Sequence, residues 1–405
     1  MKQNKKALPK GISLRKDGRY QGRFTFNGKR YTYYSKNVKE LQKKMADARY
    51  ELEHGIYGNG LDITLNHWFD IWMQEYKILT VKNSTLLLYS LNYERYVKEA
   101  IGNYLLKDIK TIHIQRIYNQ MYHDGLSLGT IQIVNSILNN LLSQAVKNDY
   151  LMKNPCLGAV LPKISKKERR VLTFYEQTVF LNAIHGDFYE ALYKIALCTG
   201  LRIGELSGLT WDDIDFDNNT LSVNKTLLYQ RDYHSGEYSF RYQTPKSGTS
   251  TRILPLIPDA VRILKKHKKE QRLYAASNCR IWQPAVGLEN LVFTTRKGTP
   301  LQEAYVIKRL ASVTRKMNLI EALAAKKEGR NAFIFENITP HTLRHSFATR
   351  AFEYGLAPKT VQELLGHSNM NITMDLYTHV TYETKKREMK KLSDMLKTDT
   401  MKRPV

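Results

Sequence analysis

Hydrophobic residues recur every three or four positions over most of the stretch between Ile63 and Asn154, which is the period of an α-helix. The widest apolar stripe lies between Ser127 and Lys147, and it consists of Ile131, Val134, Ile137, Leu138, Leu141, Leu142 and Ala145. Breaks in the pattern divide the stretch into four predicted helices. Stripes of this width are buried in helical bundles. The sequence therefore predicts an all-α domain over residues 62–156.

The first 36 residues show a different pattern, of short alternating runs separated by turn residues. Asp17-Gly18 and Asn27-Gly28 stand between these runs, and such dipeptides favour tight hairpins. A helical stripe follows between Val38 and His54 and is wide enough to cover one face of a sheet. The pattern predicts a three-stranded sheet with one helix over residues 1–56. The alternative is a disordered basic tail, which the well-formed turns disfavour.

The remainder, residues 171–397, mixes both periods. Helices are predicted up to Gly200, over 260–269 and over 305–317, and strands over 220–225, 238–244 and 252–256. The charged run 322–330 is interpreted as a surface insertion. An amphipathic tail over 385–397 can dock on its own domain or on a neighbouring protomer, and both remain open. The fold class expected is α+β and multidomain: a small basic sheet plus helix, an all-α bundle, and a mainly α domain with a small antiparallel sheet.

The net charge of the chain indicates a kind of binding partner. The chain of 405 residues carries 63 Lys and Arg against 38 Asp and Glu, a net charge of +25, which favours a polyanion such as nucleic acid over mere solubility. Basic residues cluster in the first 36 residues and in a linker near residue 166. The candidate DNA-binding residues are Arg15, Lys16, Arg19, Arg23, Lys29, Arg30, Lys166 and Lys167.

Several classes of protein are disfavoured by what the sequence lacks. No apolar run approaches ~20 residues, and the basic N-terminus has no apolar segment after it, so neither a membrane span nor a secretory signal is expected. The three cysteines are far apart, which suggests reduced thiols in a cytoplasmic protein and no zinc site. No phosphate-binding loop of the Gly-x-x-x-x-Gly-Lys-Ser/Thr type occurs, so ATP is not expected to be a cofactor.

The candidate chemistry lies near the C-terminus. Thr339-Pro340 is a strong start signal for a helix, and it places His341 and Arg344 on one face near a helix N-terminus, where phosphate is attracted. Gly366 can end a second helix, and His367 then leaves it on a fixed turn. Tyr377 follows ten residues later. A tyrosine hydroxyl is a poor nucleophile unless cations and a base surround it, and the preceding residues offer both.

These residues, His341-x-x-Arg344, Leu365-Gly366-His367 and Tyr377, resemble the C-terminal signature of tyrosine recombinases, the phage integrase family. The family also has an upstream Arg in a Gly-Leu-Arg-x-x-Glu setting, which Gly200-Leu201-Arg202 with Glu205 matches, and a Lys on a β-hairpin, which Lys246 fits. The resemblance implies six catalytic residues: Arg202, Lys246, His341, Arg344, His367 and Tyr377. It also implies an arm-type DNA-binding domain over 1–56, a core-binding domain over 62–156 and a catalytic domain over 171–397.

The reaction implied is the cutting and rejoining of DNA through a 3′-phosphotyrosyl intermediate, without metal or ATP. Tyr377 is the expected nucleophile, Arg202, Arg344 and His367 hold the phosphate, Lys246 protonates the leaving oxygen, and His341 accepts the tyrosine proton. The expected partners are double-stranded DNA at crossover and arm sites, and a homotetramer on two duplexes. An excisionase and a host DNA-bending protein can assist, and the mobile element is a phage or a conjugative transposon.

Competing interpretations remain. A relaxing topoisomerase of type IB has the same nucleophile, and a non-catalytic DNA-binding regulator can have the same fold. Tyr354 and Tyr382 are rival nucleophiles, disfavoured by spacing. His341 and His345 have the spacing of a zinc helix but lack its Glu, and Asp213-Ile214-Asp215-Phe216-Asp217 lacks the Gly and Glu of a calcium loop. No metal is therefore expected.

Overall fold

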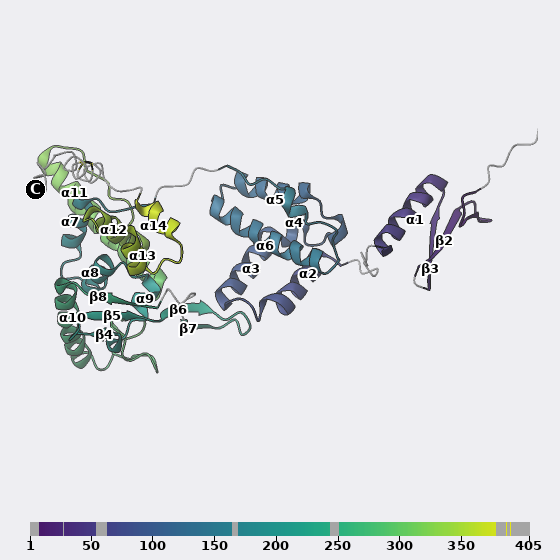
Figure 1. Cartoon of the computed structure of the whole chain (residues 1–405). Coiled ribbons are helices and arrows are strands. Elements are labelled where there is room, and N and C mark those ends of the chain that lie inside the picture. The colour runs from purple at the N-terminus through teal and green to yellow at the C-terminus, as the bar shows by residue number, and fades with distance from the viewer. Residues whose placement is uncertain are drawn as a thin grey trace, which may run out of the picture. The chain divides into compact units, whose positions relative to one another are not determined.

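The computed structural model of the chain describes residues 8–26, 28–53, 63–163, 169–243 and 251–377, together with residues 386 and 389. The chain divides into two compact units, Met1–Lys166 and Lys167–Val405, here called the N-terminal and C-terminal units (Figure 1). The mixed fold class expected from the sequence is confirmed. None of the helices in the described ranges combines the length and the apolar character needed to cross a membrane.

The first element of the N-terminal unit is an antiparallel sheet in the order β1-β2-β3, as the turn residues predicted. Its elements are β1 (Ile12–Leu14), β2 (Tyr20–Phe26) and β3 (Lys29–Ser35), followed by α1 (Val38–Glu53). Leu41 of α1 is fully buried, and Phe24 of β2 stacks on Tyr31 and Tyr33. Because successive side chains of a strand point to opposite faces, Arg23 lies on the other side of the sheet from Phe24.

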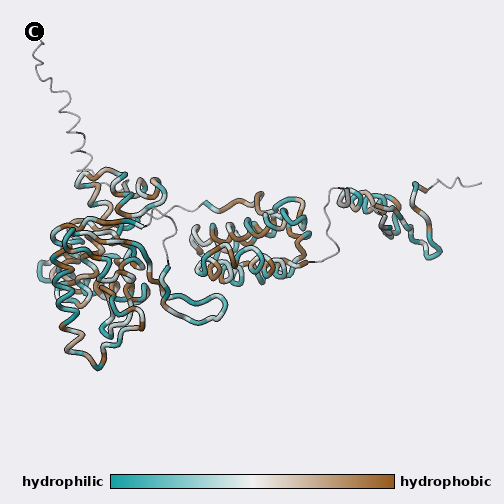
Figure 2. The backbone as a smooth tube through the Cα atoms, turned by 60° about the horizontal axis from the view of Figure 1, so that its bottom comes forward, coloured by the Kyte–Doolittle hydropathy of each residue, from teal (hydrophilic) through white to brown (hydrophobic). Residues whose placement is uncertain are grey.

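The rest of the N-terminal unit is a helical bundle. Its elements are α2 (Leu65–Ile71), a wider π-helical turn (Trp72–Lys77), α3 (Asn83–Tyr96), α4 (Lys98–Ile101), a 3₁₀ turn (Leu106–Asp108), α5 (Thr111–His123), α6 (Leu128–Lys147) and a second 3₁₀ turn (Pro155–Gly158). The apolar stripe of α6 is buried over its whole length, and Trp68 donates a hydrogen bond from its indole nitrogen to the carbonyl of Leu141 at 3.0 Å. In Figure 2 brown, hydrophobic stretches alternate with teal ones along these helices, as amphipathic packing requires.

The C-terminal unit contains two small antiparallel sheets. The first has the order β4-β5-β8, and the second is the pair β6-β7. The strands are β4 (Ile214–Asp215), β5 (Thr220–Val223), β6 (Thr226–Arg231), β7 (Tyr238–Gln243) and β8 (Arg252–Pro255). The Tyr229 ring of β6 stacks on that of Tyr238 and contacts that of Phe240 at a tilt, both in β7.

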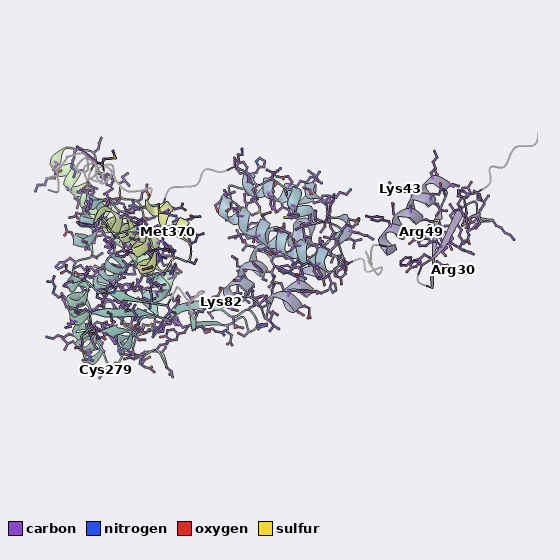
Figure 3. The ribbon with its side chains drawn as sticks, in the orientation of Figure 1. Arg30, Lys43, Arg49, Lys82, Cys279 and Met370 are labelled. Carbon is purple, nitrogen blue, oxygen red and sulfur yellow. The ribbon has the colours of Figure 1, made fainter. Side chains whose placement is uncertain are left out.

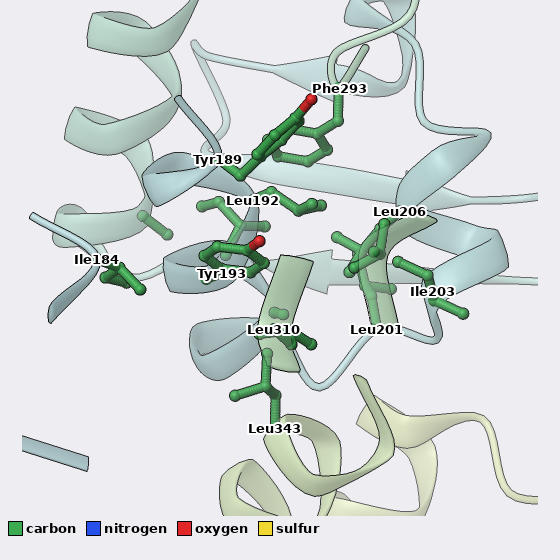
Figure 4. Packing of buried hydrophobic residues seen from close by; sticks show 14 of the residues in the cluster. Ile184, Tyr189, Leu192, Tyr193, Leu201, Ile203, Leu206, Phe293, Leu310 and Leu343 are labelled. Carbon is green, nitrogen blue, oxygen red and sulfur yellow. The ribbon is translucent and has the colours of Figure 1, made fainter. Parts of the chain in front are cut away.

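The helices of the C-terminal unit pack around α8, which contacts both α10 and α12. They are α7 (Phe174–Ala183), α8 (Glu190–Thr199), α9 (Ile203–Ser207), a 3₁₀ turn (Trp211–Asp213), α10 (Pro258–Ser277), α11 (Glu303–Glu328), α12 (Pro340–Glu353), α13 (Pro358–Leu365) and α14 (Met370–Tyr377). Figure 4 shows the core, where Leu192 and Tyr193 of α8 meet residues from α9, α11 and α12. Leu343 of α12 is part of this cluster, so the segment that carries His341 and Arg344 is fixed to the core.

Two sequence-based expectations about the C-terminal unit are wrong. The charged run 322–330 is not an insertion, because α11 continues through it to Glu328, and Gly329 then ends the helix at φ 67°. Strand β7 pairs with β6, a strand that the pattern did not predict, and β8 pairs with β5. The strands that flank Lys246 therefore belong to different sheets in the described part of the chain, and they do not form the hairpin expected for that residue.

Candidate active site

Helix α12 begins at Thr339 and Pro340, as the sequence predicted, and the structure adds a capping box with Thr342. The Thr339 hydroxyl accepts a hydrogen bond from the Thr342 backbone amide at 3.1 Å, and Pro340 occupies the first helical position. His341 is exposed on the first turn, and its ring lies 6.2 Å from that of His345, measured between centroids. Arg344, one turn after His341, points instead into the protein and is only 4% exposed.

Arg344 is held by two backbone carbonyls from distant segments. Its guanidinium donates to the carbonyl oxygen of Gly200 at 2.6 Å and to that of Leu365 at 2.7 Å. Burial, followed by the neighbouring charge of Arg202, lowers its pKa to about 9. The group therefore remains a cation at pH 7, and its position is determined by the ends of α8 and α13 together.

The C-terminal end of α13 is the structural centre of the site. Gly366 ends the helix in the left-handed conformation at φ 63°, as the sequence predicted. Arg202 donates to the carbonyl oxygens of Leu365 at 3.5 Å and of Gly366 at 3.3 Å. A helix C-terminus has unsatisfied carbonyls and a partial negative charge, so it attracts cations. The two catalytic arginines that the family resemblance implied thus meet at one helix end.

A third arginine, Arg252, also binds this helix end. It donates from Nε to the Leu364 carbonyl at 2.7 Å and from Nη2 to the Glu205 carboxylate at 3.1 Å. Glu205 also accepts from Arg202 at 2.9 Å, and the hydrogen bonds and charges of the two arginines lower its pKa although burial opposes this. Arg252 was not among the candidate residues. In the sequence, Arg252 is only a charged residue at the start of an apolar strand. The local pattern does not show that its side chain binds Glu205 and the Leu364 carbonyl.

Replacing Arg252 by Gln is expected to destabilise the region around the α13 end. Arg252 and Glu205 are 7% and 6% exposed, and removing one partner of a buried ion pair costs about 3–5 kcal/mol when the other charge is left alone. Because Arg202 still pairs with Glu205, a loss of about 3 kcal/mol or less is expected here. Hydrogen exchange at the amides of β8 and α13 should therefore accelerate in this variant. The matched control is Arg241→Gln, which breaks a more exposed pair with Asp232 and should cost less than about 1 kcal/mol. Equal exchange in both variants would contradict the proposed role of Arg252.

His367 follows α13 and lies among these cations. Its Nδ1 is 2.9 Å from the hydroxyl of Thr373, which is fully buried in α14. Burial, and then the charges of Arg344 and Arg202, lower the pKa of His367 to about 3. At neutral pH the imidazole is therefore uncharged. Thr373 was also missed by sequence reasoning, because a Thr six residues after His367 gives no local signal.

The lowered pKa of His367 makes stability depend on pH. In the unfolded chain the pKa of His367 is about 6.5, so below that pH the unfolded chain binds a proton that the folded chain excludes. The free energy of unfolding therefore falls as the pH falls from 7.5 to 5.5, and this group contributes about 1.4 kcal/mol to the loss. His267 of α10, whose pKa burial also lowers, contributes in the same direction. Denaturation of the wild type and of His367→Gln at both pH values measures the difference. An unchanged pH dependence in the variant would show that His367 is not buried in its neutral form.

The two remaining catalytic candidates are only partly visible. Tyr377 is the last residue of α14, and its backbone is described while its side chain is not. Helix α14 packs against α12 and α13, and Arg169 donates to the Ile372 carbonyl at 3.4 Å. Lys246 lies outside the described residues, between β7 and β8. The rival Tyr354 is 75% exposed at the end of α12, and Tyr382 lies outside the described residues.

The candidate DNA-binding residues of the first unit lie on the sheet. Arg15, Lys16 and Arg19 surround the β1–β2 turn, where both arginines pair with Asp17 at 3.4 Å and 2.9 Å. Arg23 pairs with Thr32 across the sheet, and Arg30 pairs with Thr25.

Directly opposite residues of an antiparallel pair share a face, and Arg23 and Thr25 are two residues apart, so Arg23 and Arg30 lie on the face away from the buried Phe24. Both side chains are exposed. The side chain of Lys29, and the linker residues Lys166 and Lys167, lie outside the described residues.

The metal-like patterns of the sequence have ordinary structural roles. Asp213 caps a turn by accepting from Thr210 and pairs with Lys225 at 2.7 Å, and Asp215 accepts from the backbone of Asp217 at 2.9 Å. Within the described ranges no group of three or more His, Cys, Asp or Glu residues is arranged to hold a metal ion.

Comparison with known proteins places this geometry in a family. Residues 171–384 match the model of the phage integrase family, and residues 64–122 match the model described as the N-terminal SAM-like domain of phage integrases. A tyrosine recombinase XerC-like protein of Caldanaerobacter subterraneus is 31% identical over 383 residues, which cover 91% of this chain and 93% of that protein. The transposase of transposon Tn916 from Enterococcus faecalis is 27% identical over 410 residues, covering 95% of each chain.

Solved structures show the same fold. The Tn1549 transposon integrase in complex with transposon right-end DNA matches with a TM-score of 0.67 and 25% identity, covering 82% of this chain and all of that chain. The lambda integrase tetramer bound to a Holliday junction matches with a TM-score of 0.54 and 20% identity, covering 92% of this chain and 96% of that chain. The chain therefore belongs to the phage integrase family of tyrosine recombinases, enzymes that cut and rejoin DNA.

Proposed function

We propose that this chain is the integrase of a mobile element, and that it integrates and excises that element by site-specific recombination. The observation that carries the proposal is the convergence of Arg202, Arg344 and His367 at the C-terminal end of α13. These two guanidinium groups and the neutral imidazole lie beside the helix that carries Tyr377. Together they can donate hydrogen bonds to the oxygens of one phosphodiester. The similarity to transposon integrases, one of them bound to transposon-end DNA, supports the substrate.

In the proposed cleavage step, the Tyr377 phenol oxygen forms a bond to phosphorus and the bond from phosphorus to the 5′-oxygen breaks. His341 accepts the phenol proton, and Lys246 protonates the leaving 5′-oxygen. The 5′-hydroxyl of another strand then attacks phosphorus, and the bond from phosphorus to the Tyr377 oxygen breaks. Lys246 takes up the hydroxyl proton, and His341 returns a proton to the tyrosine oxygen. Each step exchanges one phosphate ester for another, so the reaction needs no ATP.

The cationic groups serve the transition state. Arg202 and Arg344 donate to the non-bridging oxygens with a planar fork that Lys lacks, and His367 supplies a third hydrogen bond. A neutral His367 can donate from one ring nitrogen while the other accepts from the Thr373 hydroxyl. Thr373 is therefore a positioning residue, because it fixes which nitrogen faces the phosphate. Glu205 and Arg252 are positioning residues for Arg202.

The division of labour along the chain follows the family. We assign residues 1–56 to arm-type DNA binding, through Arg15, Lys16, Arg19, Arg23, Lys29 and Arg30. Residues 62–156 form the core-binding domain, Lys166 and Lys167 contact the phosphate backbone from the linker, and residues 171–397 form the catalytic domain. The active assembly is a homotetramer on two duplexes. The structure of a lambda integrase tetramer bound to a Holliday junction supports this assembly. The protein acts in the cytoplasm.

A suicide substrate separates this function from a relaxing topoisomerase. A duplex with a nick near the cleavage point releases a short fragment, so the covalent intermediate accumulates. An integrase should then join the bound strand to a separate duplex that carries a free 5′-hydroxyl. Supercoiled DNA that is relaxed without any strand joining to a partner duplex would instead identify a topoisomerase. DNA binding without an adduct would identify the non-catalytic regulator.

A further inference from the structure

Helix α10 carries a row of basic residues on its exposed side. The helix is fixed to the core through Ala260, Val261 and Leu264 near its start. Lys265, Lys269 and Arg272 are exposed, and Lys268 is half-buried. Positions 265, 268, 269 and 272 share one face of a helix, and they extend along about 10 Å of its axis.

Two neighbouring cations of α10 differ from these four in being paired with carboxylates. Arg262 pairs with Asp259, and Lys266 pairs with Glu270 at 3.6 Å. No ion pair joins the other four to any carboxylate of the residues that the structure describes. A helix surface normally alternates charges so that neighbours compensate each other. Uncompensated positive charge on one face is instead the footprint of a polyanion.

Aromatic rings hold two of these cations in place. The ammonium groups of Lys265 and Lys268 lie 5.6 Å and 5.3 Å from the centre of the Phe216 ring, and Lys268 lies 5.1 Å from that of Trp211. Trp211 is in turn fixed to α10 by a hydrogen bond from its indole nitrogen to Gln271 at 2.9 Å. A cation over a ring is ordered while its charge is retained.

The same residues form a shallow groove. Its lining consists of Phe216, Lys265, Lys268, Lys269, Arg272 and Leu273. Asp215 and Asp217 flank Phe216 and are exposed, but the Asp215 carboxylate already accepts hydrogen bonds from Asn218. The cations therefore outnumber the nearby acids.

This surface lies apart from the candidate active site. Figure 1 shows α10 at the opposite edge of the C-terminal unit from α9, α13 and α14. In Figure 3 the label of Cys279, just after α10, lies at the bottom of the unit, well below that of Met370 at the start of α14. A phosphate at the end of α13 is therefore not the ligand of the α10 surface.

We infer that the α10 surface, defined by Lys265, Lys268, Lys269, Arg272 and Phe216, binds the phosphate backbone of a second stretch of duplex DNA, outside the one that is cleaved. Four cations along about 10 Å can neutralise several neighbouring phosphates of a duplex. The contact is independent of base sequence, because it reads only the backbone. Its consequence is that DNA beside the crossover site, or a neighbouring duplex in the assembly, is held against the outer edge of the unit. The inference rests on the DNA-binding function but not on the assignment of any catalytic residue.

A crosslinking experiment tests it in the full chain. Cys279 is exposed and lies two residues after the end of α10. In a Cys198→Ser background an azidophenacyl group is attached to Cys279, and a 40-base-pair duplex of arbitrary sequence is added before illumination. The test variant combines Lys265→Gln, Lys268→Gln, Lys269→Gln and Arg272→Gln. The matched control removes four exposed cations from α11 by Lys308→Gln, Arg315→Gln, Lys326→Gln and Lys327→Gln.

The parent protein should crosslink to DNA, the α10 variant should do so about tenfold less, and the α11 control should stay within about twofold of the parent. The slope of log affinity against log salt should fall by about 3 in the α10 variant, since each lost phosphate contact removes about 0.9. Phe216→Leu, which keeps the apolar contact but removes the ring, should have an intermediate effect. Formation of the covalent adduct at Tyr377 should be unchanged in all of these variants.

Three results would overturn the inference. They are the absence of DNA crosslinking in the parent protein, undiminished crosslinking in the α10 variant, and an equal loss in the α10 and α11 variants, which would show an effect of net charge alone. A binding surface for an acidic protein would give the second result. Thermal unfolding of each variant verifies that the fold is retained, and failure of adduct formation in every protein would challenge the recombinase function rather than the α10 surface.

Discussion

Replacing Tyr377 by Phe is expected to abolish the covalent protein–DNA adduct and to leave DNA binding unchanged. The substitution removes one oxygen from the end of α14 and keeps the ring, so the packing of that helix against α12 and α13 is retained. Without the phenol oxygen no ester to phosphorus can form. Strand cleavage should fall on the order of 10⁶-fold, by analogy with the loss of the nucleophile in other enzymes that form covalent intermediates.

The measurement is a denaturing gel of the suicide-substrate reaction, together with a binding titration. Tyr354→Phe is the matched control, because Tyr354 is exposed, near the site in sequence, and also a tyrosine that ends a helix. It should form the adduct at the wild-type rate. If Tyr377→Phe still forms the adduct and either Tyr354→Phe or Tyr382→Phe does not, the nucleophile has been assigned to the wrong residue.

Replacing Arg202 by Lys is expected to slow cleavage by about 10²–10³-fold with little change in stability. The Arg202 side chain is 40% exposed, so its pair with Glu205 contributes less than about 1 kcal/mol, and a Lys can retain part of it. What Lys cannot supply is the second nitrogen of the fork that binds two oxygens at once. Loss of one such donor to a developing negative charge typically costs that factor in rate.

Single-turnover cleavage under saturating protein measures this effect without a contribution from binding. Arg262→Lys on α10 is the control, because it makes the same chemical change in an exposed ion pair far from the α13 end. A normal cleavage rate in Arg202→Lys would show that Arg202 acts only as a partner of Glu205. A large loss of thermal stability would show that its role is structural.

Features encoded by neighbouring residues were predictable from the sequence. Thr339 and Pro340 start α12, and Gly366 ends α13, because each acts on the backbone within one turn. The three-stranded sheet followed from two Gly-containing turns for the same reason. In each case the determining interaction spans fewer than about five residues, so the local sequence contains the whole cause.

Features that depend on distant contacts were not predictable. Strand β8 pairs with β5, about 30 residues earlier, although β7 is nearer in the chain, and no local signal distinguishes the two partners. The charged end of α11 is helical because one face of it is buried through Glu321 and Ala325, and Glu321 binds Arg330. The end of this exposed-looking run of charges therefore forms an ion pair with Glu321, whose carboxylate is buried while the Arg330 side chain is 42% exposed.

In the candidate site, too, some residues were predictable from the sequence and others depend on distant contacts. Arg202, Arg344 and His367 were found because the family motif names them. Arg252 and Thr373 were missed because they act through Glu205, the Leu364 carbonyl and the His367 ring. A residue that positions another residue is recognised only when the fold brings the two together.

The left-handed turn at Gly366 has a consequence for how the protein tolerates random substitution. A side chain there would require an unfavourable φ of 63°, and its first carbon would also lie 2.8 Å from Nη1 of Arg252. Gly355, which also has a positive φ, faces open space, so Asn can replace it at modest strain. In a library of variants selected for recombination, position 366 should therefore retain glycine alone, whereas position 355 should drift.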